Sequence, residues 1–331
     1  MSNLFSGLNA RMRPTLRYPE QDNTSSDAAA AADQQFMFPD PLPPSNSAPR
    51  ISLPESPSLS VSMGIVPPTL DIPRPLPLWL NSAYVRHIVK GNFMTLSARP
   101  KTVEPAEWIA HQVVEHYRNL WNFVRVVHEK EDNGTTICNI STCPKMSAGE
   151  SRSYTWLNKN HEPVDLPAFE YMTLMQRWIS GKIDDTAMFP TDPNAVSYAN
   201  HPDYAPVSGV YPFPQTGGDD WPGSRSGFPM QFTSTALLVF RQIFRVYAHL
   251  YWNHFVTPFY HLNLEKQLNS CFSHFILTAT TLDMLKPEEL EPMQYLIDLW
   301  AADGTFPQGS RPYMYANLER GKYIMSLSGR S

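Results

Sequence analysis

The chain has 331 residues, of which 42% are hydrophobic, enough for one large domain or two small ones. Its net charge of −5 provides no basic surface for nucleic acid, and no run of about 18 apolar residues is present to span a bilayer. The N-terminus lacks an apolar signal segment, and three cysteines are too few for a disulfide framework. We therefore expect a soluble protein of the cytoplasm or nucleus, without a membrane span or a nucleic-acid partner.

Residues 1–77 form a tail rich in proline, serine and alanine, and we expect this tail to be disordered. Stretches such as PDPLPPSNSAP and SLPESPSLS cannot bury enough apolar surface to offset the entropy of ordering the backbone. Ser56-Pro57 is open to two interpretations. It is either a site for a proline-directed kinase or, at least as readily, part of an inert solvated segment.

Three elements are predicted between the tail and residue 128. Apolar residues recur at helical spacing from residue 78 and stop at Gly91, which predicts a helix. Residues 92–103 are predicted to be extended, because Pro100 disfavours helical geometry at the residue before it. A long amphipathic helix is then predicted from residue 104 to about residue 128, with Pro105 in its first turn.

The polar face of this long helix carries an acidic ridge, formed by Glu104, Glu107 and Glu115. Carboxylates near a helix N-terminus complement the positive end of the helix dipole. On spacing alone, the ridge is more readily a solvated face than a docking surface for a basic partner.

The middle of the chain is predicted to contain a turn at residues 131–136, a cysteine-containing loop, a short strand at 153–158 and a helix at 166–183. Residues 191–227 are turn-rich and have no hydrophobic period. We interpret that stretch as an inserted, disordered loop.

Three further helices are predicted before the C-terminus. The first begins at Thr233 or Ser234, either of which is a good N-cap, and stops before Pro258. The second covers residues 263–285, and the third opens at Pro287 and runs to residue 300. Residues 301–331 are predicted to form a frayed tail.

Two cysteines and two histidines give the strongest chemical signal. Cys138 and Cys143 have C-x4-C spacing, and His249 and His254 lie five residues apart in an aromatic helical segment. Two Cys and two His are the ligand set of a four-coordinate structural zinc ion. The alternative interpretation is that these residues are buried thiols, a core histidine and a surface histidine.

The histidine spacing sets a geometric condition on this site. Side chains five positions apart on a regular helix point ~140° away from each other. Convergence therefore requires a π-bulge, a tightened turn or a helix end between Ala248 and Phe255.

From about residue 80 to residue 300 the chain resembles the MOB kinase-activator (Mob/phocein) family. The resemblance lies in motifs that occur in family order: EPAEWIA, the C-x4-C string ending in CPKMSAG, YTW, MFP, FRVYAHLYWNHF, LNSCFSHF and EPMQYLIDL. The upstream string AYVRHIVKGNFMTL is similar to the subclass that partners NDR-type kinases in fungi.

This resemblance implies an all-α domain at residues 78–302, built on a four-helix bundle, with a structural zinc ion and with a C-terminal tail at 303–331. The family's zinc ligands match Cys138, Cys143, His249 and His254. It also implies a non-enzymatic co-activator, monomeric in a heterodimer with the N-terminal regulatory segment of an NDR/LATS-type Ser/Thr kinase. Such proteins act in polarity or morphogenesis signalling, so recruitment to sites of polarised growth is expected.

The resemblance assigns roles to two further sets of residues. Because the family docks its kinase on an acidic surface of the helix that begins EPAEW, the ridge residues Glu104, Glu107 and Glu115 become candidate kinase-binding residues. Members that read phosphorylated peptides use three clustered basic residues, and the matching positions here are Arg241, Gln242 and Arg245. Loss of the middle charge implies a degenerate phosphopeptide pocket.

Two other functions remain open on the sequence. A zinc hydrolase would need an open coordination position, whereas two Cys and two His close the sphere, and no H-E-x-x-H, Walker or G-x-S-x-G motif is present. A scaffold without effect on kinase activity cannot be separated from a co-activator by sequence.

Overall fold

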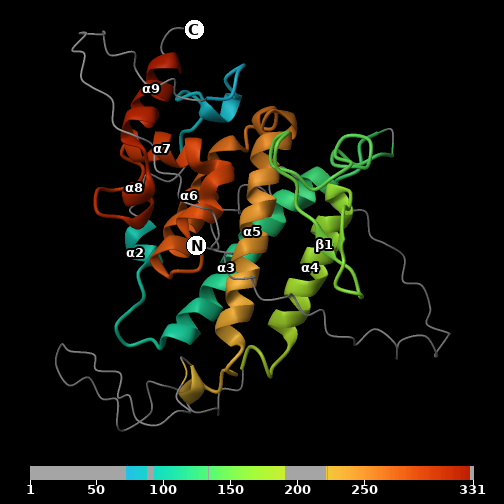
Figure 1. Ribbon diagram of the computed structural model, residues 1–331, viewed down its shortest axis with the longest axis vertical. Helices are drawn as coiled ribbons and strands as arrows, with labels where there is room; N and C mark the ends of the chain where they lie inside the picture. The colour runs from blue at the N-terminus through green and yellow to red at the C-terminus, as the bar shows by residue number, and fades with distance from the viewer. Residues whose placement is uncertain (1–71, 88–92, 133, 191–220, 222, 329–331) are drawn as a thin grey trace, which may run out of the picture. The chain divides into compact units, whose positions relative to one another are not determined.

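The structure, a computed structural model, describes residues 72–87, 93–132, 134–190, 221 and 223–328 (Figure 1). Short turns are labelled η, and η5 is π-helical whereas the others are 3-10. The elements are η1 (Leu78–Leu80), α2 (Phe93–Ser97), α3 (Pro105–His128), β1 (Trp156–Leu157), β2 (Pro163–Val164), α4 (Ala168–Asp184), η4 (Ser224–Ser226), α5 (Phe232–His254), η5 (Phe255–Tyr260), α6 (Glu265–Thr281), η6 (Pro287–Met293), α7 (Gln294–Ala302), α8 (Arg311–Tyr315) and α9 (Leu318–Ser328).

The predicted all-α class is confirmed, and four long helices form its centre. Helix α3 packs against α4, α5 and α6, and α4 also contacts α5. Figure 1 shows α5 in gold, with α4 along one side of it. Aromatic rings join α5 to α6, as in the stack of Phe240 on Phe275 at 5.7 Å between centroids and the contact of Tyr247 with Phe272 at 5.0 Å. This aromatic layer holds α5 as the buried central helix.

The predicted tail at residues 1–71 and most of the inserted loop, residues 191–220, lie outside the described residues. The end of that loop is described and ordered, contrary to the prediction for residues 223–227. Gly223 there has a φ of +94°, and a Cβ added to it would lie 2.5 Å from Cβ of Ala106 at the start of α3. Only glycine allows the returning chain to approach α3 so closely.

The helix predicted from residue 78 to Gly91 is wrong at its start, because only η1 is helical there. Asn81 ends this turn, since its Oδ1 accepts the backbone N–H of Ala83 at 3.0 Å and its backbone is extended. The freed carbonyl of Tyr84 then accepts a hydrogen bond from Asn269 Nδ2 of α6 at 2.9 Å. A side chain of the bundle thus replaces the intrahelical partner.

The extended conformation predicted for residues 92–103 is also wrong, because α2 is helical. The effect of Pro100 reaches only the residue before it, and α2 ends earlier, at Ser97. Contacts with α6 stabilise this short helix: Phe93 stacks on His274 at 5.2 Å, and Ser97 Oγ lies 2.9 Å from Thr278 Oγ1. Tertiary packing therefore decided the local conformation.

Two helix starts differ from their predictions. Helix α5 begins at Phe232, and neither Thr233 nor Ser234 caps it. Instead, Ser234 Oγ donates to the carbonyl oxygen of Gln231 at 2.8 Å. The segment that opens at Pro287 is a 3-10 turn, η6, and the α-helical geometry of α7 begins only after it.

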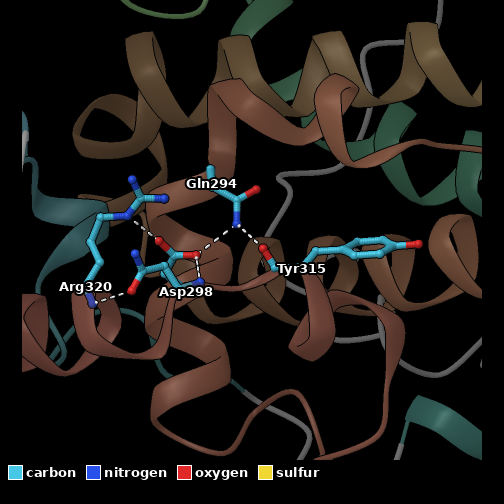
Figure 2. A network of polar contacts seen from close by, with 5 residues as sticks. Gln294, Asp298, Tyr315 and Arg320 are labelled. Atoms are coloured by element: carbon cyan, nitrogen blue, oxygen red, sulfur yellow. Dashed lines mark hydrogen bonds and ion pairs between the residues drawn. The ribbon is translucent and has the colours of Figure 1, made fainter. Parts of the chain in front are cut away.

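The predicted frayed tail after residue 301 is wrong, because α8 and α9 pack against α7. Figure 2 shows the polar network that holds them, centred on the fully buried carboxylate of Asp298 in α7. Asp298 is ion-paired with Arg320 of α9 and accepts hydrogen bonds from Gln294 Nε2 at 2.8 Å and from the backbone N–H of Asn317 at 2.9 Å. Gln294 also donates to the carbonyl oxygen of Tyr315 at 3.2 Å.

Backbone contact reinforces this network. A Cβ added to Gly321 of α9 would lie 2.1 Å from the carbonyl oxygen of Asp298. The two helices therefore touch main chain to main chain at that point, which only glycine permits. Residues 294–328 form an integral C-terminal clasp on the bundle.

We predict that Asp298→Ala lowers the free energy of unfolding by about 3–5 kcal/mol, because it leaves the partly buried Arg320 guanidinium without its counter-ion. Urea unfolding monitored by circular dichroism measures the change. The control is Lys145→Ala, which removes one partner of the exposed Lys145–Asp165 pair and should cost under about 1 kcal/mol. Equal effects of the two substitutions would show that Asp298 does not anchor the clasp.

Candidate metal centre and docking surfaces

The loop with the two cysteines is shaped by its own polar side chains. Asn139 Oδ1 accepts the backbone N–H groups of Ser141 and Thr142 at 2.8 and 3.1 Å, which closes a tight turn between the cysteines. This turn brings the backbone N–H of Cys143 within 2.8 Å of the carbonyl oxygen of Asn139. The turn at Asn139 therefore directs both thiols toward the same side of the loop.

Two neighbouring helices fix the position of this loop. The backbone N–H of Cys138 donates to the carbonyl oxygen of Val127 in α3 at 2.9 Å. The carbonyl oxygen of Cys143 accepts from the backbone N–H of Ala168, the first residue of α4, at 3.0 Å. The cysteine loop thus connects the C-terminal end of α3 to the N-terminal end of α4.

The two histidines converge because α5 ends at the second of them, His254. His249 lies within α5, whereas His254 is its last residue and has a non-helical backbone, with φ of −129° and ψ of 2°. The chain then continues as the π-helical turn η5. The five-residue spacing required a helix irregularity or a helix end between Ala248 and Phe255, and this prediction is confirmed. The centroids of the two imidazole rings lie 5.1 Å apart.

The four side chains form one buried cluster. The ligand atoms of Cys138, Cys143, His249 and His254 all lie within 4.8 Å of one another. Cys138 Sγ lies 3.7 Å from His249 Nε2, and Cys143 Sγ lies 3.5 Å from His254 Nε2. Bond lengths of about 2.3 Å to sulfur and about 2.0 Å to nitrogen give a tetrahedral S-to-N edge of ~3.5 Å. The cluster therefore fits a four-coordinate metal ion.

The backbone prepares one histidine for this role. His249 Nδ1 donates to the carbonyl oxygen of Ser147 at 2.8 Å, which leaves Nε2 without a proton and directed at the cysteines. Ser147 is not recognisable from the sequence as a functional residue, because a backbone carbonyl carries no residue-type signal.

The thiols also interact directly. A hydrogen bond between the two side chains raises the pKa of Cys138 and lowers the pKa of Cys143. All three cysteines are free thiols, and the third, Cys271, is buried elsewhere in α6. A bound cation would hold Cys138 and Cys143 as thiolates, since metal ligation requires that form.

The three residues of the acidic ridge differ in burial. Glu104 is only 5% exposed and caps α3, where its carboxylate accepts the backbone N–H groups of Ala106 at 2.7 Å and Glu107 at 3.2 Å. Burial raises the pKa of Glu104, and these hydrogen bonds oppose the rise. The assignment of Glu104 to an exposed docking face is therefore wrong, because its carboxylate is already enclosed.

Glu107 and Glu115 remain half-buried on one face of α3. Glu107 Oε1 accepts a hydrogen bond from Ser226 Oγ at 2.7 Å, and Glu115 Oε1 accepts one from Asn119 Nδ2 at 3.2 Å. Each residue is therefore partly exposed. Two turns separate them, or ~12 Å along the helix axis.

The three residues of the predicted phosphopeptide pocket have different surroundings. Gln242 is 3% exposed and accepts a hydrogen bond from Tyr171 OH at 2.6 Å. Arg245 donates to the same hydroxyl at 3.1 Å, and its guanidinium lies 5.2 Å from the ring centre of Tyr154. Arg241 is ion-paired with Glu289 of η6. Gln242, at the middle position, is thus a buried structural residue, whereas Arg241 and Arg245 are only half-buried.

The described residues include no helix long and apolar enough to cross a membrane. Their fold and site define the class: a helical domain in which a Cys2His2 cluster, complete without a further ligand, ties an irregular loop to the central helix. The Mob1/phocein family profile matches residues 85–203 and 221–293. The chain belongs to the Mob1/phocein family.

Curated relatives agree with this assignment. "Maintenance of ploidy protein mob2" of Schizosaccharomyces pombe is 33% identical over 67% of this chain and 76% of its own length. "CBK1 kinase activator protein MOB2" of Saccharomyces cerevisiae is 33% identical over 69% of this chain, and its Candida albicans counterpart is 30% identical over 71%. The matches span 66% and 63% of those two relatives.

We predict that Cys143→Ser removes bound metal and lowers the thermal midpoint by on the order of 10 °C or more, because the free energy of metal binding contributes directly to folding. Mass spectrometry of the metal content and differential scanning calorimetry measure the two effects. Cys271→Ala is the matched control, since it deletes a buried thiol that lies outside the cluster. Stoichiometric metal in Cys143→Ser would contradict the site.

Proposed function

We propose that this protein is a non-catalytic co-activator that binds the basic N-terminal regulatory segment of an NDR/LATS-type Ser/Thr kinase and promotes the active state of that kinase. The observation that carries this proposal is membership of the Mob1/phocein family together with the similarity to two relatives named as CBK1 kinase activators. We further propose a monomer that forms a heterodimer with the kinase, acts in polarity or morphogenesis signalling and is recruited to sites of polarised growth from cytoplasm or nucleus.

The proposed metal is zinc. A buried pair of cysteines and a pair of histidines with tetrahedral spacing suits zinc, whereas magnesium and calcium prefer oxygen ligands. Its role would be structural, because it would join α5 to the loop that bridges α3 and α4. Metal analysis of the unmodified protein identifies the ion.

The proposed docking surface is the α3 face with Glu107 and Glu115. Both side chains are half-buried and lie ~12 Å apart along the helix axis, which suits basic residues spread along a partner helix. Arginine forks bind carboxylates through paired charge-assisted hydrogen bonds. Because such surface charges mainly steer association, binding should weaken with salt, over a screening length of ~8 Å at physiological ionic strength.

Two alternative functions are separable from the proposal. Hydrolysis at the metal would need a ligand position open to water, and the four side chains of the cluster already supply the four ligands of a tetrahedral ion. A scaffold would bind the kinase without changing its activity. A kinase assay with and without this protein therefore distinguishes a scaffold from a co-activator.

We predict that the double variant Glu107→Lys with Glu115→Lys weakens binding to the kinase segment on the order of 100-fold and abolishes kinase stimulation, because both contacts become repulsive. Calorimetric titration with the N-terminal segment of an NDR-type kinase measures binding, and phosphorylation of a substrate peptide measures stimulation.

The control carries the same change in charge elsewhere: Glu129→Lys at the far end of α3 together with Glu170→Lys on α4, both exposed. It should bind and stimulate normally. Circular dichroism and metal content confirm that both variants are folded. Normal binding by the Glu107→Lys, Glu115→Lys variant would place the docking surface elsewhere on the domain.

A further inference from the structure

A pair of buried histidines lies where α3 packs against α6. His116 of α3 is fully buried and His274 of α6 is 2% exposed, and the centroids of their two rings lie 4.8 Å apart. Neither residue belongs to the Cys2His2 cluster. The proposed kinase binding assigns no role to either of them. We call these two residues the histidine pair.

Aromatic rings from three helices enclose the histidine pair. Phe93 of α2 stacks on His274 at 5.2 Å between ring centroids. Phe275 of α6 and Phe240 of α5 meet the ring of His116 edge-on, at 5.3 and 6.2 Å. An imidazolium ion in such surroundings loses its hydration shell without gaining a set of hydrogen-bond acceptors. The packing therefore favours the neutral form of both imidazoles.

The ring nitrogens of the pair also lack partners. Both ring nitrogens of His116 and Nε2 of His274 are buried without a hydrogen-bond partner among the described residues. A neutral imidazole carries one N–H group and an imidazolium carries two, so protonation would add a buried donor to each ring. Gln112 Oε1, one turn before His116 on α3, is a buried acceptor without a partner, but an amide carries no charge that balances an imidazolium.

The ionisable groups on the surrounding helices provide no counter-ion. Helix α2 contains no ionisable side chain. On α6, burial raises the pKa of the Cys271 thiol to about 12, and on α5, burial raises the pKa of the Tyr247 hydroxyl well above its ordinary value, so both groups are neutral near pH ~7. On α3, the carboxylate of Glu115 is directed to Asn119, whose Nδ2 donates to it at 3.2 Å.

Burial lowers the pKa of both members of the pair. The pKa of His274 falls to about 4. For His116, burial is again the largest cause, followed by repulsion from His274 and from the exposed His111, and its pKa lies well below the ordinary value for histidine. An unfolded chain binds these protons near pH ~6.5, so below that pH the unfolded state holds more protons than the folded state. Stability is therefore complete above pH ~6.5 and is lost as the pH falls toward ~4.

We infer that the histidine pair makes the packing of α3 on α6 sensitive to acid, because the folded domain holds both rings neutral and a proton on either ring favours separation of the two helices. Helix α2 would separate with them, since its Phe93 packs on His274. The pair is thus a pH-dependent device in the core of the bundle. This inference goes beyond the proposed kinase binding and does not depend on it.

The test is urea unfolding of the full-length, metal-bound protein, followed by circular dichroism from about pH 7.5 to about pH 5.5. Over this interval, one histidine that is neutral only in the folded state changes the equilibrium constant of unfolding by about tenfold. His116→Phe and His274→Phe keep an aromatic ring that cannot take up a proton. We expect the change in the unfolding constant to be about tenfold smaller in each variant and about 100-fold smaller in the double variant.

Controls separate the pair from the other histidines. Acid also weakens metal binding, because histidine ligands must be neutral, but this contribution is shared by all variants and is followed by metal analysis at each pH. His261→Asn changes an exposed histidine of the same domain and should leave the pH dependence unchanged. Equal pH dependence in the unmodified protein and in either phenylalanine variant would overturn the inference, as would an equal reduction in His261→Asn.

A second measurement uses the unmodified protein and decides the question if the phenylalanine variants do not fold. NMR titration of the assigned, isotope-labelled imidazole signals follows the protonation of each ring directly. We expect both rings of the pair to stay neutral in the folded protein down to about pH 5.5. Protonation of either ring near pH ~6.5 in the folded protein would overturn the inference. Binding of the kinase segment near pH ~7.5 should be unchanged in all folded variants, so failure of the α3 docking face would leave this inference intact.

Discussion

The convergence of four ligand side chains is the constraint on which the rest of this domain depends. The cysteine loop has little regular structure, and its hydrogen bonds to Val127 of α3 and Ala168 of α4 would not by themselves fix it against α5. The hydrogen bond from His249 to Ser147 is one link to α5, and a metal ion held by Cys138, Cys143, His249 and His254 would strengthen that connection. It would join three helices at one point, so the free energy of binding the ion becomes free energy of folding.

Helix α5 links this centre to the rest of the bundle. Its C-terminal end carries both histidines, and its middle carries Arg241 and Arg245, less than four turns away. The same helix is anchored to η6 through Trp252 and to α6 through stacked aromatic rings. The kinase-docking face that we propose lies on α3.

The sequence predicted those features that depend on residue type and spacing. Pro105 marked the start of α3, and ligand chemistry brought together two pairs of residues more than a hundred positions apart. Prediction from the sequence failed where a residue far away in the chain determines the local structure. The helix α2 exists because Phe93 packs on His274, and the C-terminal clasp exists because the buried Asp298 collects Arg320 and Asn317. Glu104 has the right position for a docking residue, but the returning chain at Gly223 encloses it.

X-ray absorption spectroscopy at the zinc edge, on purified full-length protein, tests the central claim most directly because it reports the ligands of the ion itself. A closed structural centre predicts stoichiometric zinc with two sulfur ligands at about 2.3 Å and two nitrogen ligands at about 2.0 Å. A shell with an oxygen ligand in place of one side chain would indicate an open, water-bearing ion. That result, or folded protein without stoichiometric zinc, would contradict a closed structural centre.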